Sequence, residues 1–213
     1  MKISILLSSD SHPVTKFIKL WIKKNSNNHD ISLYHSSDQL SGGDILFLIS
    51  CNEIIGRDVR ALFSKTLVLH ASDLPKGRGW SPHIWDIIFD ADHITITLLE
   101  AVDSLDAGDI WRKLKIPVPK HYLWYEINEL LFKAELELMD FAINHFTDIT
   151  PEPQVPGGET YLPKRSPKDS EINPFDTIAN QFNLIRISDP ERFPSRFKLH
   201  GHQYKLILEK IEE

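Results

Sequence analysis

The sequence predicts an α/β fold, in which a mostly parallel, twisted sheet carries helices on both faces. Short apolar runs typical of buried strands alternate with segments whose apolar residues recur at helical spacing. Polar residues follow the ends of several of these runs, as in Ser50-Cys51-Asn52 and at His70. Open sheets of this kind bind ligands at the carboxyl ends of their strands, so we expect a site at that edge.

The first half of the chain supplies most of the predicted elements. Ser8-Ser9-Asp10-Ser11 is suited to capping a helix, Pro13 fits a first helical turn, and Gly42-Gly43 interrupts the chain before an apolar run. Helices are predicted over residues 14–22, 56–63 and 125–146. Strands are predicted over residues 2–7, 30–34, 44–50, 66–69, 94–99 and 111–118.

The last third of the chain predicts a smaller unit. Residues 150–173 hold seven prolines and glycines, a composition typical of a linker or surface loop. A short helix is expected over 174–183, and strands over 197–199 and 203–208 would form a hairpin around His200-Gly201-His202. We therefore predict a main domain over residues 1–149. Residues 150–213 would form a linker loop and a short α+β appendage, ending in the hairpin and packed on that domain.

Composition excludes several classes of protein. The 213 residues carry a formal net charge of −6, which gives no basic surface for a nucleic-acid partner. Cys51 is the one cysteine, so a disulfide framework and a cysteine-based metal site are excluded. No apolar run reaches about 18 residues, and Met1 leads directly into a strand pattern, so neither a membrane span nor a signal peptide is expected. These features predict a cytoplasmic protein.

Two loops carry the residues with catalytic potential. His70 ends the predicted strand over 66–69 and opens a loop rich in glycine and charge. Asp106 lies in a second loop, after the predicted strand over 94–99. An imidazole and a carboxylate brought together from two strand ends form an acid/base pair. Taken alone, a strand-end histidine is more often a structural or surface residue.

Together the two loops resemble the signature of the folate-dependent formyltransferases. In that family an Asn-x-His-x-Ser-x-Leu-Pro segment ending in Arg-Gly is followed by a loop with Asp-x-Gly. The resemblance continues through residues 161–172 and 182–186 and covers roughly residues 40–208. It implies the Rossmann-like formyltransferase fold. The matching residues are His70, Ser72, Leu74, Pro75, Arg78, Gly79, Asp106 and Gly108.

The resemblance implies transfer of a formyl group from 10-formyltetrahydrofolate to an amine, with 10-formyltetrahydrofolate as co-substrate. His70 would be the acid/base and would help to stabilise the oxyanion, and Asp106 would orient and charge-stabilise the imidazole. The chain departs from the family two residues before His70, where Val68 replaces the asparagine. Asn52 is the nearest candidate to supply the missing polar group, and the alternative is that Asn52 only caps a helix.

The folate pocket is implied in the same way. Family members hold the pterin mainly through backbone groups of two segments, which correspond here to residues 52–55 and 101–105. Leu74 and Ile54 would form apolar walls, although ordinary core packing explains each aliphatic residue equally well. The residues expected to bind the folate are Asn52, Glu53, Ile54, Ile55, Leu74, Val102, Ser104 and Leu105.

The amine substrate is expected near the residues of the His70 loop and directly after it. Ser72, Lys76, Arg78 and Trp80 would supply a hydroxyl, two cations and an aromatic face, which suit a phosphate and a sugar or base. Lys76 is also explained as solvated surface. The ten histidines show no metal-ligand spacing, and His200 and His202 lack a third partner, so no metal is predicted.

Within the family, the residues favour a nucleotide-linked amino sugar as acceptor. Residues 8–12 contain no glycine, unlike the phosphate loop of the enzyme that formylates glycinamide ribonucleotide, and the C-terminal part is too short for a basic tRNA-binding domain. The motif with Gly79-Trp80-Ser81-Pro82 resembles sugar formyltransferases, and suggests a UDP-linked 4-amino-4,6-dideoxy sugar for pseudaminic-type nonulosonic acid or O-antigen synthesis. The alternatives are a catalytically impaired folate-binding relative, or a formyltransferase for another amine such as tRNA or a ribonucleotide.

Overall fold

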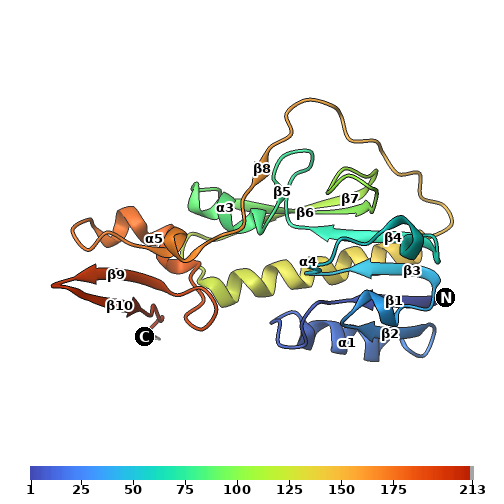
Figure 1. Ribbon diagram of the computed structural model, residues 1–213, viewed down its shortest axis with the longest axis horizontal. Helices are drawn as coiled ribbons and strands as arrows, with labels where there is room; N and C mark the ends of the chain where they lie inside the picture. The colour runs from blue at the N-terminus through green and yellow to red at the C-terminus, as the bar shows by residue number, and fades with distance from the viewer. Residues whose placement is uncertain (212–213) are drawn as a thin grey trace.

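The computed structural model describes residues 1–211 and is organised around one six-stranded sheet (Figure 1). The strand order is β2-β1-β3-β4-β6-β7. The first four strands in that order are parallel, whereas β6 and β7 are antiparallel to their neighbours. The predicted, mainly parallel sheet is therefore confirmed. The strands are β1 (Lys2–Leu6), β2 (Asp30–Tyr34), β3 (Gly43–Leu48), β4 (Phe63–His70), β6 (His93–Glu100) and β7 (Ile110–Pro117).

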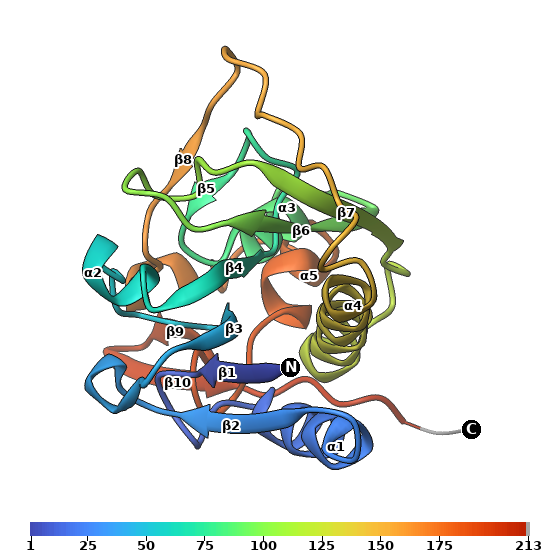
Figure 2. The same cartoon turned by 90° about the vertical axis from the view of Figure 1, so that its right-hand side faces the viewer.

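Alternating residues of the parallel strands build a core on each face of the sheet. Ile5 and Phe47 belong to one fully buried cluster, which packs against α1 (Thr15–Asn25) and α4 (Trp124–Asn144). Their neighbours Leu6 and Leu48 belong to a second cluster on the opposite face. That cluster is covered by α2 (Arg57–Arg60) and by the segment around η1 (Ser37–Gln39). Figure 2 shows α1 and α4 lying along one side of the sheet and α2 on the other.

The C-terminal third crosses the sheet edge and ends in a hairpin. Strand β8 (Tyr161–Leu162) pairs in parallel with β5 (Arg78–Gly79), and the 3₁₀ helix η2 (Pro167–Ser170) follows it. Helix α5 (Ile178–Arg186) then packs against α3 (Pro82–Ile88). The predicted hairpin is confirmed, and its strands are β9 (Ser195–Leu199) and β10 (His202–Leu206).

Three predicted details of secondary structure are wrong. The helix expected over 56–63 ends at Arg60, because Phe63 already begins β4. The helix expected over 174–183 begins at Ile178, because the Thr177 hydroxyl caps it by accepting a hydrogen bond from the backbone N–H of Asn180. Residues 150–173, expected to be loop throughout, contain β8 and η2. Helix α3 has no counterpart among the predicted elements.

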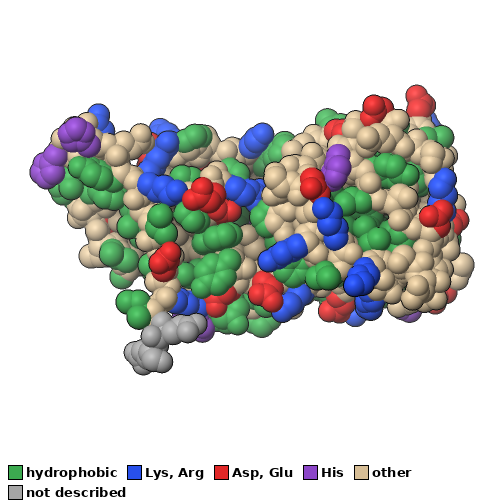
Figure 3. Space-filling model, turned by 90° about the horizontal axis from the view of Figure 1, so that it is seen from below, with side chains coloured by type: hydrophobic (Ala, Val, Ile, Leu, Met, Phe, Trp, Pro, Cys, Tyr) green, Lys and Arg blue, Asp and Glu red, His purple; other side chains and the backbone are tan. Residues whose placement is uncertain are grey.

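The surface carries charged side chains of both signs. Figure 3 shows them interspersed on the face seen from below, where hydrophobic side chains gather over the part that bears the hairpin. Within residues 1–211, no helix combines the length and the apolar character needed to cross a membrane.

Candidate active site

His70 lies at the carboxyl end of β4 and is fixed by the loop that follows it. Its side chain is only 9% exposed. Nε2 lies 2.8 Å from the carbonyl oxygen of Gly77, and a carbonyl can only accept a hydrogen bond, so Nε2 carries the ring hydrogen. In the neutral ring this leaves the lone pair on Nδ1, where the imidazole can take up a proton.

Asp106 faces that nitrogen from the second loop. Its Oδ1 lies 3.6 Å from Nδ1 of His70, and its side chain is 6% exposed. The other carboxylate oxygen, Oδ2, accepts a hydrogen bond of 3.0 Å from the backbone N–H of Gly79. Asp106 has a left-handed backbone (φ 51°), which aspartate tolerates better than most residues. The structure thus brings together the two residues that the sequence singled out. The 3.6 Å separation is between Oδ1 of Asp106 and Nδ1, the His70 nitrogen that can accept a proton.

Residues 154–162 form a strap that holds both loops, a role that no sequence pattern indicated. The side-chain amide of Gln154 donates to the backbone oxygens of Asp106 and Gly108, at 2.8 and 2.9 Å. Thr160 accepts hydrogen bonds from the backbone N–H of Gly77 at its hydroxyl and of Arg78 at its carbonyl. The strap therefore fixes the carbonyl that orients His70 and the turn that presents Asp106.

Arg78, predicted to bind substrate, lies inside this arrangement. It is buried and donates to the side chains of Gln154 and Tyr161, at 2.8 and 3.2 Å. These contacts connect Arg78 to the Asp106 loop through Gln154. They favour a positioning role for its guanidinium, while direct substrate binding stays a prediction.

Two glycines of the motif are required by close backbone approaches. A Cβ at Gly79 would lie 2.5 Å from the carbonyl oxygen of Leu162, which is the strap. A Cβ at Gly108 would lie 1.8 Å from the carbonyl oxygen of Glu100. Neither distance is tolerated by a real Cβ atom. The strap and the Asp106 loop can therefore reach their positions only with glycine at these two sites.

The two segments predicted to bind folate lie side by side, joined by Arg60. Its guanidinium donates to the backbone oxygens of Ile55 (2.8 Å) and Val102 (3.4 Å) and pairs with the carboxylate of Asp103. Sequence reasoning missed Arg60, whose only signal was its place in the short helix after the first segment. Ser104 is exposed, and the backbone N–H of Ser37 donates to Glu53.

The apolar residues of the predicted folate pocket divide into two groups. Ile54, Val102 and Leu105 are 89%, 43% and 56% exposed, so they are available to an apolar ligand. Ile55 and Leu74 are buried and offer a ligand little surface. Their assignment to a folate pocket stays a prediction.

Val68 occupies the position where the family has asparagine. Its side chain packs with Cys51 and Ala101 against the core cluster that includes Leu48. Asn52 is exposed, and its backbone N–H donates to the Ser8 hydroxyl at 2.7 Å. The alternative that Asn52 caps a helix is wrong, because Gly56 precedes the first turn of α2. Its catalytic role stays a prediction.

The other residues predicted to bind substrate are placed differently from one another. Ser72 is buried, and its hydroxyl has no hydrogen-bond partner among residues 1–211. Lys76 is exposed, and Trp80 is 39% exposed. The ammonium group of Lys164 lies 4.6 Å from the centre of the Trp80 ring, so a cation from the strap side already covers this aromatic face. Their roles toward a substrate stay predictions.

Two further histidines accompany His70 and were missed at the sequence level. Burial lowers the pKa of His83 to about 4, helped by the positive charges of His70, His12 and Arg165. Burial also lowers the pKa of His12 to about 4, helped by Arg192. Both rings are therefore neutral at pH 7 and lie within electrostatic range of the His70 site. His12 follows the carboxyl end of β1, which was the available signal.

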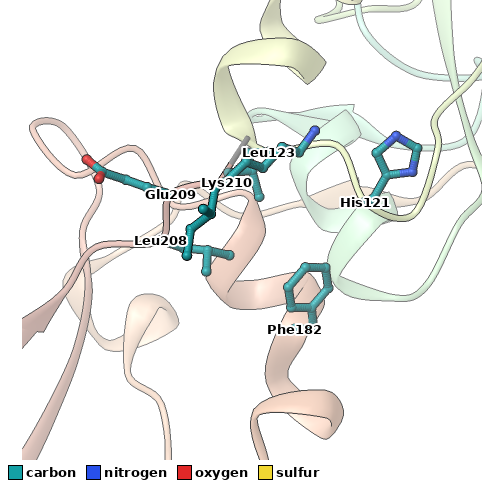
Figure 4. A pocket seen from close by; sticks show the side chains of 7 residues that line it. His121, Leu123, Phe182, Leu208, Glu209 and Lys210 are labelled. Carbon is teal, nitrogen blue, oxygen red and sulfur yellow. The ribbon is translucent and has the colours of Figure 1, made fainter. Parts of the chain in front are cut away.

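A cavity of about 430 Å³ lies apart from these residues (Figure 4). It is formed near the start of α4, by α5 and by the segment after β10, and none of the predicted site residues lines it. Within residues 1–211, no group of three or more histidine, cysteine or acidic side chains is arranged to hold a metal ion. The lining residues of the cavity are His121, Leu123, Phe182, Leu208, Glu209, Lys210 and Ile211.

Comparison of the sequence with known proteins finds similarity to formyltransferases. No family model matches the chain. Methionyl-tRNA formyltransferase of Streptococcus pneumoniae (strain Hungary19A-6) is 29% identical over 143 residues, which cover 65% of this chain and 45% of that protein. Over these residues the chain is similar to formyltransferases. It spans less than half the length of the curated formyltransferases that it matches.

Solved structures of two formyltransferases and of HypX share the fold. Methionyl-tRNA formyltransferase from Clostridium thermocellum has a TM-score of 0.80 at 22% identity, covering 95% of this chain and 90% of that one. A 4-N formyltransferase from Francisella tularensis has a TM-score of 0.71 at 18% identity, covering 99% and 98%. HypX from Aquifex aeolicus, solved in complex with tetrahydrofolic acid, has a TM-score of 0.77 at 21% identity, covering 95% and 36%. The formyltransferase family uses folate.

Proposed function

We propose that this formyltransferase transfers the formyl group of 10-formyltetrahydrofolate to the amine of a nucleotide-linked amino sugar. The observation that carries the proposal is the placement of His70 and Asp106, with Nδ1 of His70 facing Oδ1 of Asp106 across 3.6 Å. A sugar N-formyltransferase from Shewanella sp FDAARGOS_354 shares this fold, with a TM-score of 0.73, which supports a sugar acceptor. We further propose a UDP-linked 4-amino-4,6-dideoxy sugar as the preferred acceptor.

His70 carries out both proton transfers, and Asp106 supports it electrostatically. The bound folate supplies the formyl carbon, to which the neutral amine of the acceptor forms its new C–N bond. Nδ1 of His70 takes the proton that the amine nitrogen loses, because Nε2 is held by the carbonyl of Gly77. Asp106 stabilises the positive charge that develops on the ring. The same Nδ1–H then returns the proton to the folate nitrogen as the bond from that nitrogen to the formyl carbon breaks.

The exposed apolar side chains at the two folate segments fit a pterin. Ile54 from one segment and Val102 and Leu105 from the other are largely exposed, although exposure of such residues is unfavourable in water. Arg60 holds both segments through their backbone oxygens, so their spacing is set before a ligand arrives. A flat aromatic ligand inserted between them would cover the apolar side chains and meet backbone groups.

The oxyanion contact is the weak point of the site. Val68 carries no hydrogen-bonding group, and loss of one oxyanion donor in enzymes that rely on it reduces the rate by about 10²- to 10³-fold. We propose that Asn52, which is exposed at the same edge of the sheet, supplies this contact. The second candidate function, a folate-binding relative with impaired catalysis, is favoured by the same valine.

Two substitutions distinguish these candidates. If Asn52 is the oxyanion donor, Asn52→Ala lowers kcat by about 10²-fold or more and leaves the melting temperature unchanged. If the chain is an impaired relative, Val68→Asn restores a missing donor and raises the rate strongly. A neutral or harmful effect of Val68→Asn supports a site rebuilt around Asn52, and a large gain overturns that assignment.

The acceptor is tested with a panel of amines. UDP- and dTDP-linked amino sugars are incubated with 10-formyltetrahydrofolate, and formylated products are identified by mass spectrometry; methionyl-tRNA and glycinamide ribonucleotide are included as competing acceptors. We expect formylation of a nucleotide-linked 4-amino sugar, and His70→Ala and Asp106→Ala lower turnover by roughly 10²-fold or more. Transfer to none of the sugars refutes the proposed acceptor class, and near-normal turnover in His70→Ala refutes the catalytic assignment.

A further inference from the structure

Three arginines line a second cavity, of about 200 Å³, between η2 and β9. Arg165 approaches from the segment that precedes η2, Arg192 from the segment that leads into β9, and Arg196 from β9 itself. Phe193 lies between two of them: the guanidinium carbons of Arg165 and Arg192 are 5.9 and 5.5 Å from the centre of its ring. The aromatic ring therefore holds two cations on the same wall of the cavity.

Two of these guanidinium groups keep a buried donor without a protein acceptor. Arg165 donates from Nη2 to the Ser170 hydroxyl (2.9 Å) and to the carbonyl of Asp169 (3.3 Å). Arg196 lies 3.8 Å from Glu171 through Nη2. The Nε atoms of both arginines are buried and have no hydrogen-bond partner among residues 1–211. Because an unmade hydrogen bond of a buried charged group is costly, these atoms indicate an acceptor that is not part of the chain.

The carboxylates nearby do not neutralise this cavity. The side chain of Asp169 accepts hydrogen bonds from the backbone N–H and the hydroxyl of Ser166, both at 2.7 Å. Glu171 is 53% exposed, so water screens its pairing with Arg196. Burial lowers the pKa of the Arg165 guanidinium, which means that its charge is incompletely solvated where it lies. An anionic ligand would compensate this loss of solvation.

Two arginines of the cavity act electrostatically on the histidines that accompany His70. Arg165 is among the charges that lower the pKa of His83, together with His70 and His12. Arg192 acts in the same way on His12. Such effects require charges within a few ångströms to about one Debye length, so Arg165 and His70 both lie within that range of His83.

We propose that Arg165, Arg192 and Arg196 bind the diphosphate of the nucleotide-linked acceptor and thereby place its sugar amine toward His70. Guanidinium groups match phosphate oxygens with two parallel hydrogen bonds, which makes arginine the residue best suited to a diphosphate. Naming the acceptor rests on the proposed function. The binding of a diphosphate in this cavity is a separate statement about these three side chains.

Direct binding measurements test the cavity without catalysis. The full chain is titrated by calorimetry with inorganic diphosphate, UDP, UMP and uridine. We expect UDP and inorganic diphosphate to bind more tightly than UMP, and uridine to bind weakest. Arg192 is exposed, so Arg192→Gln removes one cation without disturbing the core and should weaken UDP binding by about tenfold or more. Lys198→Gln removes an equal charge from an exposed position on β9 outside the cavity and should leave binding unchanged.

Arg165 is partly buried, so its removal could disturb folding, and a conservative substitution is used at this position. Arg165→Lys keeps the charge but loses the guanidinium fork, and it should weaken inorganic diphosphate while the melting temperature and folate binding stay at wild-type values. Equal losses of UDP affinity in Arg192→Gln and Lys198→Gln would show that binding depends on the net charge of the protein and not on the cavity, and would overturn the proposal. So would a selective loss of polyglutamylated folate in Arg192→Gln with UDP binding intact, because the cavity would then hold the folate tail.

The experiments distinguish failure of the diphosphate site from failure of the proposed function. If no amino sugar is formylated but UDP binding depends on Arg192, the diphosphate site stands and the proposed function fails. If an amino sugar is formylated and its KM is the same in Arg192→Gln and in the wild-type protein, the proposed function stands and the diphosphate site is refuted.

Discussion

Glu135 on α4 makes folding stability depend on pH, and Glu135→Gln tests this. The residue is 5% exposed, within a helix face made of Leu131, Leu138 and other core residues. One carboxyl oxygen, Oε2, is buried and has no hydrogen-bond partner among residues 1–211. Burial raises the pKa of this carboxyl from 4.5 to about 8, so the folded protein keeps it protonated at pH 7.

The sign follows from the proton count of the two states. Between about pH 4.5 and 8 the folded chain holds the proton and the unfolded chain does not, so unfolding releases a proton and stability falls as the pH rises. The difference of about 3.5 pKa units, at about 1.36 kcal/mol per unit, corresponds to about 5 kcal/mol across this window. Above pH 8 both states are ionised, and the loss is complete.

The measurement is denaturant unfolding at several pH values from 5 to 9. Glutamine has the shape of the protonated carboxyl and does not titrate, so Glu135→Gln should match the wild-type protein near pH 5 and exceed it increasingly toward pH 8. Glu137→Gln is the matched control, because Glu137 is exposed on the same helix. Parallel curves for wild type and Glu135→Gln over the whole range would refute the reasoning.

Three further substitutions or conditions follow from the site. In Gly108→Ala the new Cβ would lie 1.8 Å from the Glu100 carbonyl oxygen, so the substitution should displace the Asp106 loop and lower turnover by about 10²-fold. Gly56→Ala is the control, because a Cβ there meets nothing within 4 Å and turnover should not change. Equal turnover in the two variants would contradict the steric argument. Gln154→Ala removes two hydrogen bonds to the Asp106 loop, so it should lower kcat about tenfold with little change in the KM for folate. Gln203→Ala, at an exposed position, is the control and should have no effect on kcat. An unchanged kcat in Gln154→Ala would show that the strap does not position Asp106. Because the pKa values of His12 and His83 are lowered to about 4, stability is fully present above about pH 6.5 and is lost as the pH falls toward 4; His83→Gln should flatten this loss in acid unfolding curves, and an unchanged slope would contradict it.

The pattern of apolar residues was sufficient to predict the sheet. Strand β2 over Asp30–Tyr34 coincides with the predicted strand, and β6 and β7 differ from their predictions by a residue at each end. The antiparallel direction of β6 was not predicted, because strand direction depends on how the chain returns to the sheet and not on the side-chain pattern. Helix α3 was not predicted. It is short, and it begins directly after the catalytic loop at Ser81, whose backbone is left-handed and whose side chain makes no capping hydrogen bond.

The pair of His70 and Asp106 was predictable from the motif that the two loops share with a known family, and not from strand direction, because β6 runs antiparallel to β4. Its supporting residues were not, because contacts such as that of Gln154 with the Asp106 loop join positions 48 residues apart. Nothing in the spacing of a proline- and glycine-rich segment indicates which of its side chains will bond to a distant turn. The roles of the individual site residues and the division of the chain at residue 149 stay predictions.

The strap connects the C-terminal part of the chain to both catalytic side chains. Thr160 bonds to Gly77, whose carbonyl sets the tautomer of His70, and β8 pairs with the strand that contains Gly79, whose N–H holds Asp106. The same segment continues to Arg165 in the proposed diphosphate site. A ligand diphosphate bound there would therefore pull on the chain that fixes both catalytic side chains. Under the proposed diphosphate site, acceptor binding and the alignment of His70 with Asp106 are coupled through residues 154–165, because Gln154 and Thr160 of this segment bond to both catalytic loops.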